Sequence, residues 1–278
     1  MFGLRRSIVA AAFIALAAGS AVAAEKVGEA VLIKTTVTGD GGTLVTRSPV
    51  HRDERIRTSS SGLGEFIFQD GTKFAVGANS SVVIDKFVFN DSKSVKNLTI
   101  NAAKGSFRWI SGGSPSSAYK INTPAGTVGI RGTAVDIFVG SGGKTAVVLL
   151  KGQARFCGRN GCRELKRRCD VVVATPGGGI TDPKRVDSGT FRELGTARAL
   201  PFISGHQRLS GKFRVGSGCM AKALLDNSEV APKRAAAEPE PPAPEPPAPE
   251  PEPVPKGNNG KGNGPGDGSP NGKDDTGG

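Results

Sequence analysis

The sequence predicts an all-β protein whose strands are short and joined by tight turns. Forty glycines, nineteen prolines and an aromatic content of 5% argue against a helical bundle. Apolar, β-branched runs recur at intervals of about ten residues, and glycines stand at the corners between them. This pattern fits a β-sandwich, a barrel or a coil of strands like a β-helix, and composition alone does not choose among the three.

The clearest hairpin is predicted at residues 65–76. Asp70-Gly71 separates two apolar runs there and supplies the positive φ angles that a two-residue turn requires. A first strand is expected at residues 28–37, where apolar and β-branched residues end at a glycine cluster. The other predicted strands are residues 82–89, 98–101, 106–110, 119–122, 145–150 and 170–174.

Residues 122–138, with the sequence N-T-P-A-G-T-V-G-I-R-G-T-A-V-D-I-F, combine turn signals with strand alternation. Pro124 favours an extended Thr123, and three glycines allow the backbone to turn or to be approached closely. Apolar residues alternate with others on both sides of Gly132. We therefore predict a strand, a sharp corner or bulge and a second strand, with a neighbouring layer of the sheet close by.

The C-terminal part of the chain predicts a partly helical cap and then a disordered tail. Apolar residues from Phe191 to Leu200 have helical spacing, which stops at Pro201, and residues 220–225 are a second helix candidate. We expect these segments to cover an open end of the β structure and to shield its strand edges. From residue 231 a proline- and glutamate-rich stretch, followed by a glycine- and asparagine-rich one, predicts no fixed structure.

Residues 1–24 have the pattern of a secretory signal peptide: two arginines, an apolar run and small residues before a cleavage site. The alternative is an uncleaved anchor, but the many alanines, glycines and serines make the run only mildly apolar. We therefore expect a periplasmic or secreted protein. Its expected parts are the signal at 1–24, a β domain at 25–156, a cysteine-containing β and helical extension at 157–230 and the disordered tail at 231–278.

Four cysteines in an exported chain favour two disulfides, and the sequence permits three pairings. We expect Cys157 to pair with Cys162 across a short loop, and Cys169 with Cys219. The alternative is zinc held by the first three cysteines, but their spacing is unusual for a zinc finger and neither histidine lies nearby. We expect no metal and no cofactor.

The formal net charge of +12 is concentrated in the body of the chain, because nine acidic and five basic residues lie from residue 229 to the end. In an exported protein a basic surface favours anionic partners: acidic glycans, membrane surfaces or an acidic protein, but not nucleic acid. The alternative is a solvated basic surface that serves solubility. The two histidines lie far apart, and no nucleophile elbow or phosphate loop is present, so an enzyme is not expected.

Four stretches in this order resemble the FecR domain, a periplasmic β-rich module. They are T-P-A-G-T-V-G-I-R-G-T-A-V-D-I-F (residues 123–138), F-Q-D-G-T-K-F-A-V-G-A-N-S-S-V-V-I (68–84), L-T-I-N-A-A-K-G-S-F-R-W (98–109) and K-T-A-V-V-L-L-K-G-Q-A-R-F (144–156). The resemblance extends over about residues 27–156. It implies a rolled, β-helix-like arrangement of short strands, and on this ground we prefer that fold to the β-sandwich.

FecR-like regulators join a cytoplasmic segment that holds a sigma factor, a membrane helix and a periplasmic domain that receives a signal from an outer-membrane transporter. Here an export signal directly precedes the domain, so only the sensing or scaffolding role is carried over. The leading hypothesis is a non-catalytic periplasmic module that binds an envelope protein or an acidic glycan. The alternatives are a detached signal-sensing component of such a system, and a glycan-active envelope enzyme with an acidic pair.

Three residues are candidates for the binding site. Arg131 lies between glycines at the predicted corner, where it is exposed or else hydrogen bonded to backbone carbonyls inside the turn. Trp109, the only tryptophan, either packs in the core or stacks on a ligand, and Arg108 precedes it.

Overall fold

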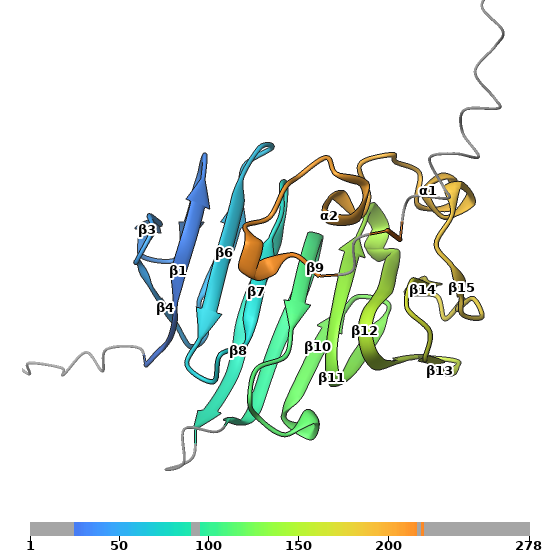
Figure 1. The fold of residues 1–278 in the computed structure, drawn as a ribbon, viewed down its shortest axis with the longest axis horizontal. Helices are drawn as coiled ribbons and strands as arrows, with labels where there is room; N and C mark the ends of the chain where they lie inside the picture. Colours follow the sequence, from blue (N-terminus) through green and yellow to red (C-terminus); the bar gives the residue numbers. More distant parts are fainter. Residues whose placement is uncertain (1–24, 90–94, 216–217, 220–278) are drawn as a thin grey trace, which may run out of the picture. The chain divides into compact units, whose positions relative to one another are not determined.

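A computed structural model of the chain describes residues 25–89, 95–215 and 218–219. They all belong to one compact unit, Met1–Ala231. The predicted signal at 1–24, the helix candidate at 220–225 and the predicted tail at 231–278 lie outside the described residues. The described part is mostly β, as predicted, with a few short helices near its C-terminal end (Figure 1). No helix within it is long and apolar enough to cross a membrane.

The strands form one large, open, mixed sheet in the described part of the chain. The strands of its first half are β1 (Lys26–Lys34), β2 (Val37–Gly39), β3 (Gly42–Thr43), β4 (Pro49–His51), β5 (Arg55–Thr58), β6 (Leu63–Phe68), β7 (Lys73–Val76) and β8 (Ser81–Phe89). Those of its second half are β9 (Val95–Ile110), β10 (Tyr119–Thr123), β11 (Gly126–Val139), β12 (Thr145–Gly158), β13 (Gly161–Leu165), β14 (Asp170–Ala174) and β15 (Lys184–Arg185).

Three long strands, β9, β11 and β12, fold this sheet into two layers. The first half of β9 pairs with β8 and β10, whereas its second half pairs with β7 and β11. We call layer A the part of the sheet that contains β2, β5, β8, β10, β13 and the halves of β9, β11 and β12 that pair with one another and with these strands. Layer B contains β1, β4, β6, β7, β14, β15 and the other halves of β9, β11 and β12.

This topology corrects the finer fold prediction. A β-helix-like roll stacks its turns through parallel pairing, but among the described strands only β9 and β10 pair in parallel. The other described pairs are all antiparallel, some between consecutive strands and some between strands far apart in the chain. The mostly β class is confirmed, with the described strands in one large, open, mixed sheet.

The main core lies between the two layers and is rich in aromatic rings. Phe68 of layer B lies 6.2 Å from Phe87 of layer A, and Trp109 of layer B lies 5.4 Å from Tyr119 of layer A, between ring centroids. All four side chains are buried. Aromatic pairs at these separations stabilise a core beyond the area that they bury, so these contacts join the two layers.

The predicted corner in residues 122–138 is the point at which β11 passes from layer A to layer B. Gly132 has a φ of 59°, and Gly152 of the paired strand has a φ of 79°. The register between the strands shifts beside Gly132, which is the mark of a bulge. Thr133 fixes the bend, because its hydroxyl donates to the carbonyl of Arg131, 2.6 Å away.

The C-terminal segment covers the outer face of layer B. Its helices are α1 (Ser188–Leu194), α2 (Pro201–Ser204) and the 3₁₀ turn η3 (Gly211–Phe213). Leu194 and Leu200 pack there in a second apolar cluster with Val148 and Val171. The segment was expected to shield strand edges, but it lies on a sheet face instead (Figure 1). The predicted single helix ends early, because Gly195 turns the chain with a φ of 74°.

Both disulfides have the predicted pairing. Cys157 and Cys162 face each other in the β12–β13 hairpin, with their Cα atoms 4.0 Å apart. Cys169 joins Cys219, across 50 residues of chain, at the apolar cluster under α1 and α2. The second bond therefore fixes the end of the described segment to the sheet.

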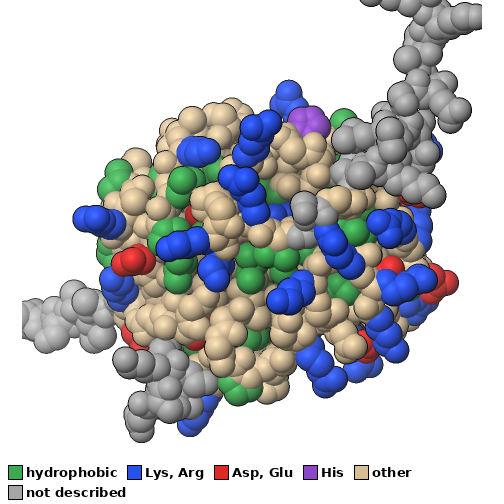
Figure 2. All heavy atoms as spheres, in the orientation of Figure 1, with side chains coloured by type: hydrophobic (Ala, Val, Ile, Leu, Met, Phe, Trp, Pro, Cys, Tyr) green, Lys and Arg blue, Asp and Glu red, His purple; other side chains and the backbone are tan. Residues whose placement is uncertain are grey.

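The surface that results is strongly basic. Figure 2 shows lysine and arginine side chains spread over one face of the molecule, with few acidic side chains among them. The predicted concentration of positive charge in the body of the chain is thus visible on the folded surface.

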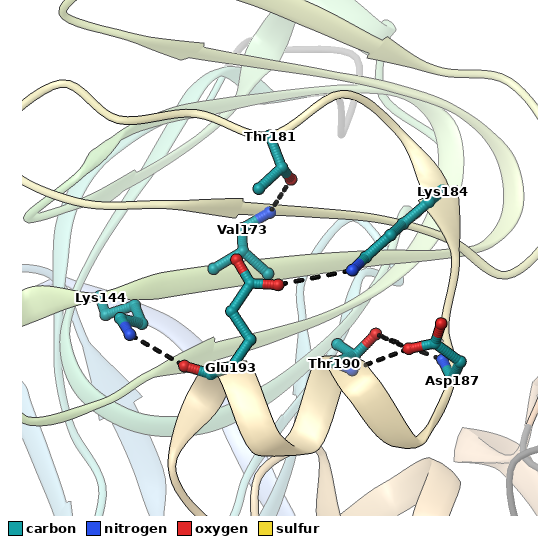
Figure 3. A network of polar contacts seen from close by, with 7 residues as sticks. All are labelled: Lys144, Val173, Thr181, Lys184, Asp187, Thr190 and Glu193. Atoms are coloured by element: carbon teal, nitrogen blue, oxygen red, sulfur yellow. Dashed lines mark hydrogen bonds and ion pairs between the residues drawn. The ribbon is translucent and has the colours of Figure 1, made fainter.

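Polar contacts hold helix α1 against the sheet (Figure 3). Asp187 caps the helix by accepting hydrogen bonds from the backbone nitrogen and the hydroxyl of Thr190, at 2.8 and 2.9 Å. Lys144 donates to the carbonyl of Glu193 at 2.8 Å, and the Glu193 carboxylate lies 3.5 Å from the amine of Lys184. Partial burial raises the pKa of Asp187, but the Thr190 hydrogen bonds and nearby cations outweigh it and leave the pKa lowered.

Substitution of Gly152 tests the corner. A Cβ atom there would lie 2.6 Å from the carbonyl oxygen of Gly132, whereas one at Gly142, which also has a positive φ, would meet nothing within 4 Å. G142A should cost about 1–2 kcal/mol from backbone strain alone. G152A should lower the free energy of unfolding by roughly 1–3 kcal/mol more, from steric overlap, in a denaturant titration. Equal costs would contradict the close approach.

Substitution of Asp187 tests the cap of α1 through its pH dependence. D187A should lower the free energy of unfolding by about 1 kcal/mol at neutral pH, the usual value of an N-cap. The folded-state pKa is lowered, so the carboxylate stabilises the fold above the unfolded value of about 4. That contribution is lost as the pH falls through the folded value. The difference between wild type and D187A should therefore shrink in acid, and a constant difference would contradict the role.

Candidate functional site

The signature stretch forms the middle of an exposed polar face on layer A. Gly129 of β11 lies between Lys120 of β10 and Arg155 of β12 in the strand register. Because glycine has no side chain, a hollow of 370 Å³ opens above it. The residues that line the hollow are Ser116, Ser117, Tyr119, Lys120, Gly129, Ile130, Arg131, Gln153, Ala154, Arg155 and Glu164.

Positive charge dominates this hollow. Lys120, Arg131 and Arg155 are all exposed at its rim. Glu164 is the one carboxylate among the described lining residues, and it lies 3.3 Å from Arg155. Both partners are about half exposed, and such a surface pair contributes little stability, so the arginine is available to another anion.

A row of amides and hydroxyls continues the face beside the hollow. Asn122 donates to Asn101 at 2.9 Å, and Thr127 donates to Asn122 at 3.1 Å. These side chains come from three adjacent strands, β9, β10 and β11. The row had not been recognised from the sequence, although polar residues alternate with apolar ones in each strand, because the pairing of β9 with β10 depends on tertiary structure.

The three predicted site residues have different surroundings. Arg131 is exposed on this face, which is one of the two alternatives predicted for it. Its binding role remains a prediction. Trp109 is fully buried in the core between the layers. Its side chain is inaccessible to a ligand, so the packing alternative describes it and the binding role does not.

Arg108 also has a structural position instead of the predicted binding one. Its side chain lies on the opposite face of β9 from Trp109 and is buried under the C-terminal segment. It makes two hydrogen bonds of 2.6 Å to the carboxylate of Asp136, and donates to the carbonyl of Phe213 at 3.3 Å. The guanidinium carbon also lies 5.6 Å from the ring centroid of Phe202.

The Arg108–Asp136 pair attaches the C-terminal segment to layer B. Burial raises the pKa of Asp136, and the charge and hydrogen bonds of Arg108 oppose that rise. Glu65, which is fully buried, also attaches the C-terminal segment to layer B. It accepts hydrogen bonds from the backbone nitrogen of Ser210, at 2.7 Å, and from its hydroxyl. Neither acid was singled out from the sequence, since outward-facing polar residues in a strand usually face water.

Asp70, predicted as a turn residue, accepts hydrogen bonds from side chains of its own loop and of other segments. Its loop has four residues, 69–72, between β6 and β7 in place of the predicted two. The carboxylate accepts hydrogen bonds from the hydroxyls of Thr72, Ser114 and Tyr119 at 3.0, 3.0 and 2.7 Å. Burial, together with this carboxylate, raises the pKa of Tyr119, which keeps the phenol protonated and donating.

No group of three or more potential metal ligands occurs among the residues that the structure describes. The four cysteines are used in disulfides.

Comparison with known proteins identifies the domain. Residues 54–155 match the family model described as FecR protein. No curated protein matches the chain. Two crystal structures of "a putative anti-sigma factor" from Parabacteroides distasonis are similar at 12% identity, with TM-scores of 0.40 and 0.39. The similarity covers 51% of this chain and 64% and 65% of those chains, just under two thirds of their length.

Residues 54–155 of the chain therefore form a FecR-like domain. The matched residues include the signature stretch and all of the strands that form the polar face of layer A up to Arg155. The sheet extends beyond the match, because β1 and β4 precede it and β14 follows it.

A double-mutant cycle tests the structural role of Arg108. R108M should lower the free energy of unfolding by about 3–5 kcal/mol, because it leaves the Asp136 carboxylate buried without its partner. Combining it with D136L should cost clearly less than the sum of the single variants. R52M, which breaks an exposed pair with Glu25, is the control and should cost under about 1 kcal/mol. Additive costs in the cycle would contradict the pairing.

Proposed function

We propose that this chain is an exported, non-catalytic binding and scaffolding module, and that it engages an anionic component of the cell envelope through the polar face of layer A. One observation supports this most directly. Three exposed cations, Lys120, Arg131 and Arg155, surround the hollow above Gly129 with a single carboxylate among them. Such a surface attracts anions at long range, and salt weakens the attraction.

The shape of the face suits a macromolecule better than a small ligand. The hollow is open to solvent, and the row of Asn101, Asn122 and Thr127 adds hydrogen-bonding groups from three adjacent strands beside it. Large partners bind through many such contacts around a few charged ones. The partner is then an acidic protein surface or an acidic glycan, and a protein partner would include the signalling domain of a transporter.

A catalytic role for this face has less support. Hydrolysis of a glycoside uses two carboxyl groups that flank the scissile bond. Glu164 is the one carboxylate among the described lining residues, and it is paired with Arg155. The two disulfides suit an oxidising compartment, which supports a periplasmic or secreted location for this binding function.

The test is capture from an envelope extract with the exported protein at low and moderate salt, with retained proteins and glycans identified. K120Q/R131Q/R155Q should lose most of the retained partner. K34Q/K166Q/R185Q removes the same charge from exposed positions outside the hollow and should retain it.

The salt dependence identifies the class of partner. A discrete protein held at both salt concentrations would indicate a protein partner and favour the scaffold or signal-sensing versions. An acidic glycan released as salt rises would indicate a glycan partner. Equal retention by the two triple variants would overturn the assignment of this face.

A further inference from the structure

A second hollow lies where the bend of β9 meets the C-terminal segment. Its volume is 520 Å³, within the range of pockets that hold small ligands. The described residues that line it are Ser60, Ser61, Ala78, Asn79, Lys104, Gly105, Ser106, Phe138, Val139, Gly140, Ser141, Thr196, Arg198, Pro201, His206 and Gln207. None of them lines the hollow on layer A.

The charged groups of this second hollow are all basic or potentially basic. Lys104, Arg198 and His206 are exposed within it, and no aspartate or glutamate is among its described lining residues. Within the described part of the chain these three side chains form no ion pair, although nine such pairs occur elsewhere. Lys104 and Arg198 are thus two cations without an acidic partner at a concave site, which favours an anionic ligand.

The remaining lining combines hydroxyls with one aromatic ring. Ser60, Ser61, Ser141 and Thr196 carry hydroxyls, which can donate and accept hydrogen bonds. The Ser61 hydroxyl also donates to Thr35 at 3.4 Å, and that of Thr196 accepts from the backbone nitrogen of Arg198 at 3.1 Å. Phe138 is half-buried, and a Cβ atom at Gly140 would lie 3.1 Å from its ring, so the glycine leaves that side of the ring open. Cations, hydroxyls and an accessible ring together match a ligand with an acid group, several hydroxyls and an apolar face.

The walls of the hollow are held in place before any ligand binds. Gln207 accepts from the backbone nitrogen of Ala78 at 3.0 Å and donates to the carbonyl of Gly62 at 3.1 Å, which joins the C-terminal segment to the sheet. Arg198 follows the anchored helix α1, and its backbone nitrogen donates to the hydroxyl of Thr196 at 3.1 Å. A preformed site loses less entropy on binding.

We propose that this second hollow binds an acidic sugar, either alone or at the end of a short oligosaccharide. Its carboxylate lies between Lys104 and Arg198, its hydroxyls meet the serine and threonine hydroxyls, and its apolar face lies on Phe138. A simple anion uses only the cations, whereas an acidic peptide can meet the cations and hydroxyls but has no sugar ring to lie on Phe138. This site is separate from the polar face of layer A, and it does not depend on the function proposed for that face.

The test is isothermal titration of the exported full-length protein with trigalacturonic acid. Galactotriose serves as the neutral probe, inorganic phosphate as the simple anion and triglutamate as the acidic peptide. Trigalacturonic acid should bind at least tenfold more tightly than each of the other three. K104Q/R198Q should weaken its binding at least tenfold, since each charged hydrogen bond is worth about a factor of ten. The charge-matched control K86Q/K166Q should bind as the wild type does.

A second variant separates a sugar site from an anion site. F138L keeps an apolar side chain but removes the ring, and it should weaken trigalacturonic acid severalfold while phosphate binding stays the same. A melting temperature near that of the wild type would show that F138L is folded. The proposal is overturned if trigalacturonic acid does not bind, if phosphate or triglutamate binds equally well, or if K104Q/R198Q and K86Q/K166Q behave alike. Failure of the envelope capture by layer A leaves these outcomes unchanged.

Discussion

The structure depends on the close approach of two backbones at the corner where β11 and β12 pass between the layers. A Cβ atom at Gly152 would lie 2.6 Å from the carbonyl oxygen of Gly132, and both glycines have a positive φ. The bulge there changes which alternate residues face inward: Val128 points into the core before the corner and Val135 after it. The same strand therefore presents Arg131 outward on layer A and an acid outward on layer B.

The outer faces of the two layers have different environments, because one faces solvent and the other is covered by protein. The outer face of layer A faces solvent, with its amides and hydroxyls hydrogen bonded along the row of strands. The outer face of layer B is covered by the C-terminal segment. The polar groups buried beneath that segment are paired in an ion pair or in hydrogen bonds. Arg108 with Asp136, and Glu65 with Ser210, illustrate this. Both hollows lie where covering is incomplete: one on the open face, and one at the margin of the segment.

Local sequence signals were reliable where the cause of the structure is local. The glycine corner and the Cys157–Cys162 hairpin each depend on residues close together in the chain, and both are present. The β6–β7 hairpin is also present, but with a four-residue loop in place of the predicted two-residue turn. The Asp70 carboxylate in this loop also accepts hydrogen bonds from Ser114 and Tyr119, which no local signal indicates. The Cys169–Cys219 bond was also predicted, although spacing alone allowed other pairings.

The sequence by itself determined the all-β class, the position of the corner, the basic body and the resemblance to the FecR domain. Each follows from composition, from the alternation of side chains along a strand, or from glycine at a position of positive φ. Only the tertiary structure decided the pairing of distant strands and which polar residues are covered. Arg108 and Arg131 are alike in sequence terms, since both are arginines that face outward from a strand. One is buried and the other exposed because residues more than 100 positions away fold over one face and leave the other open to solvent.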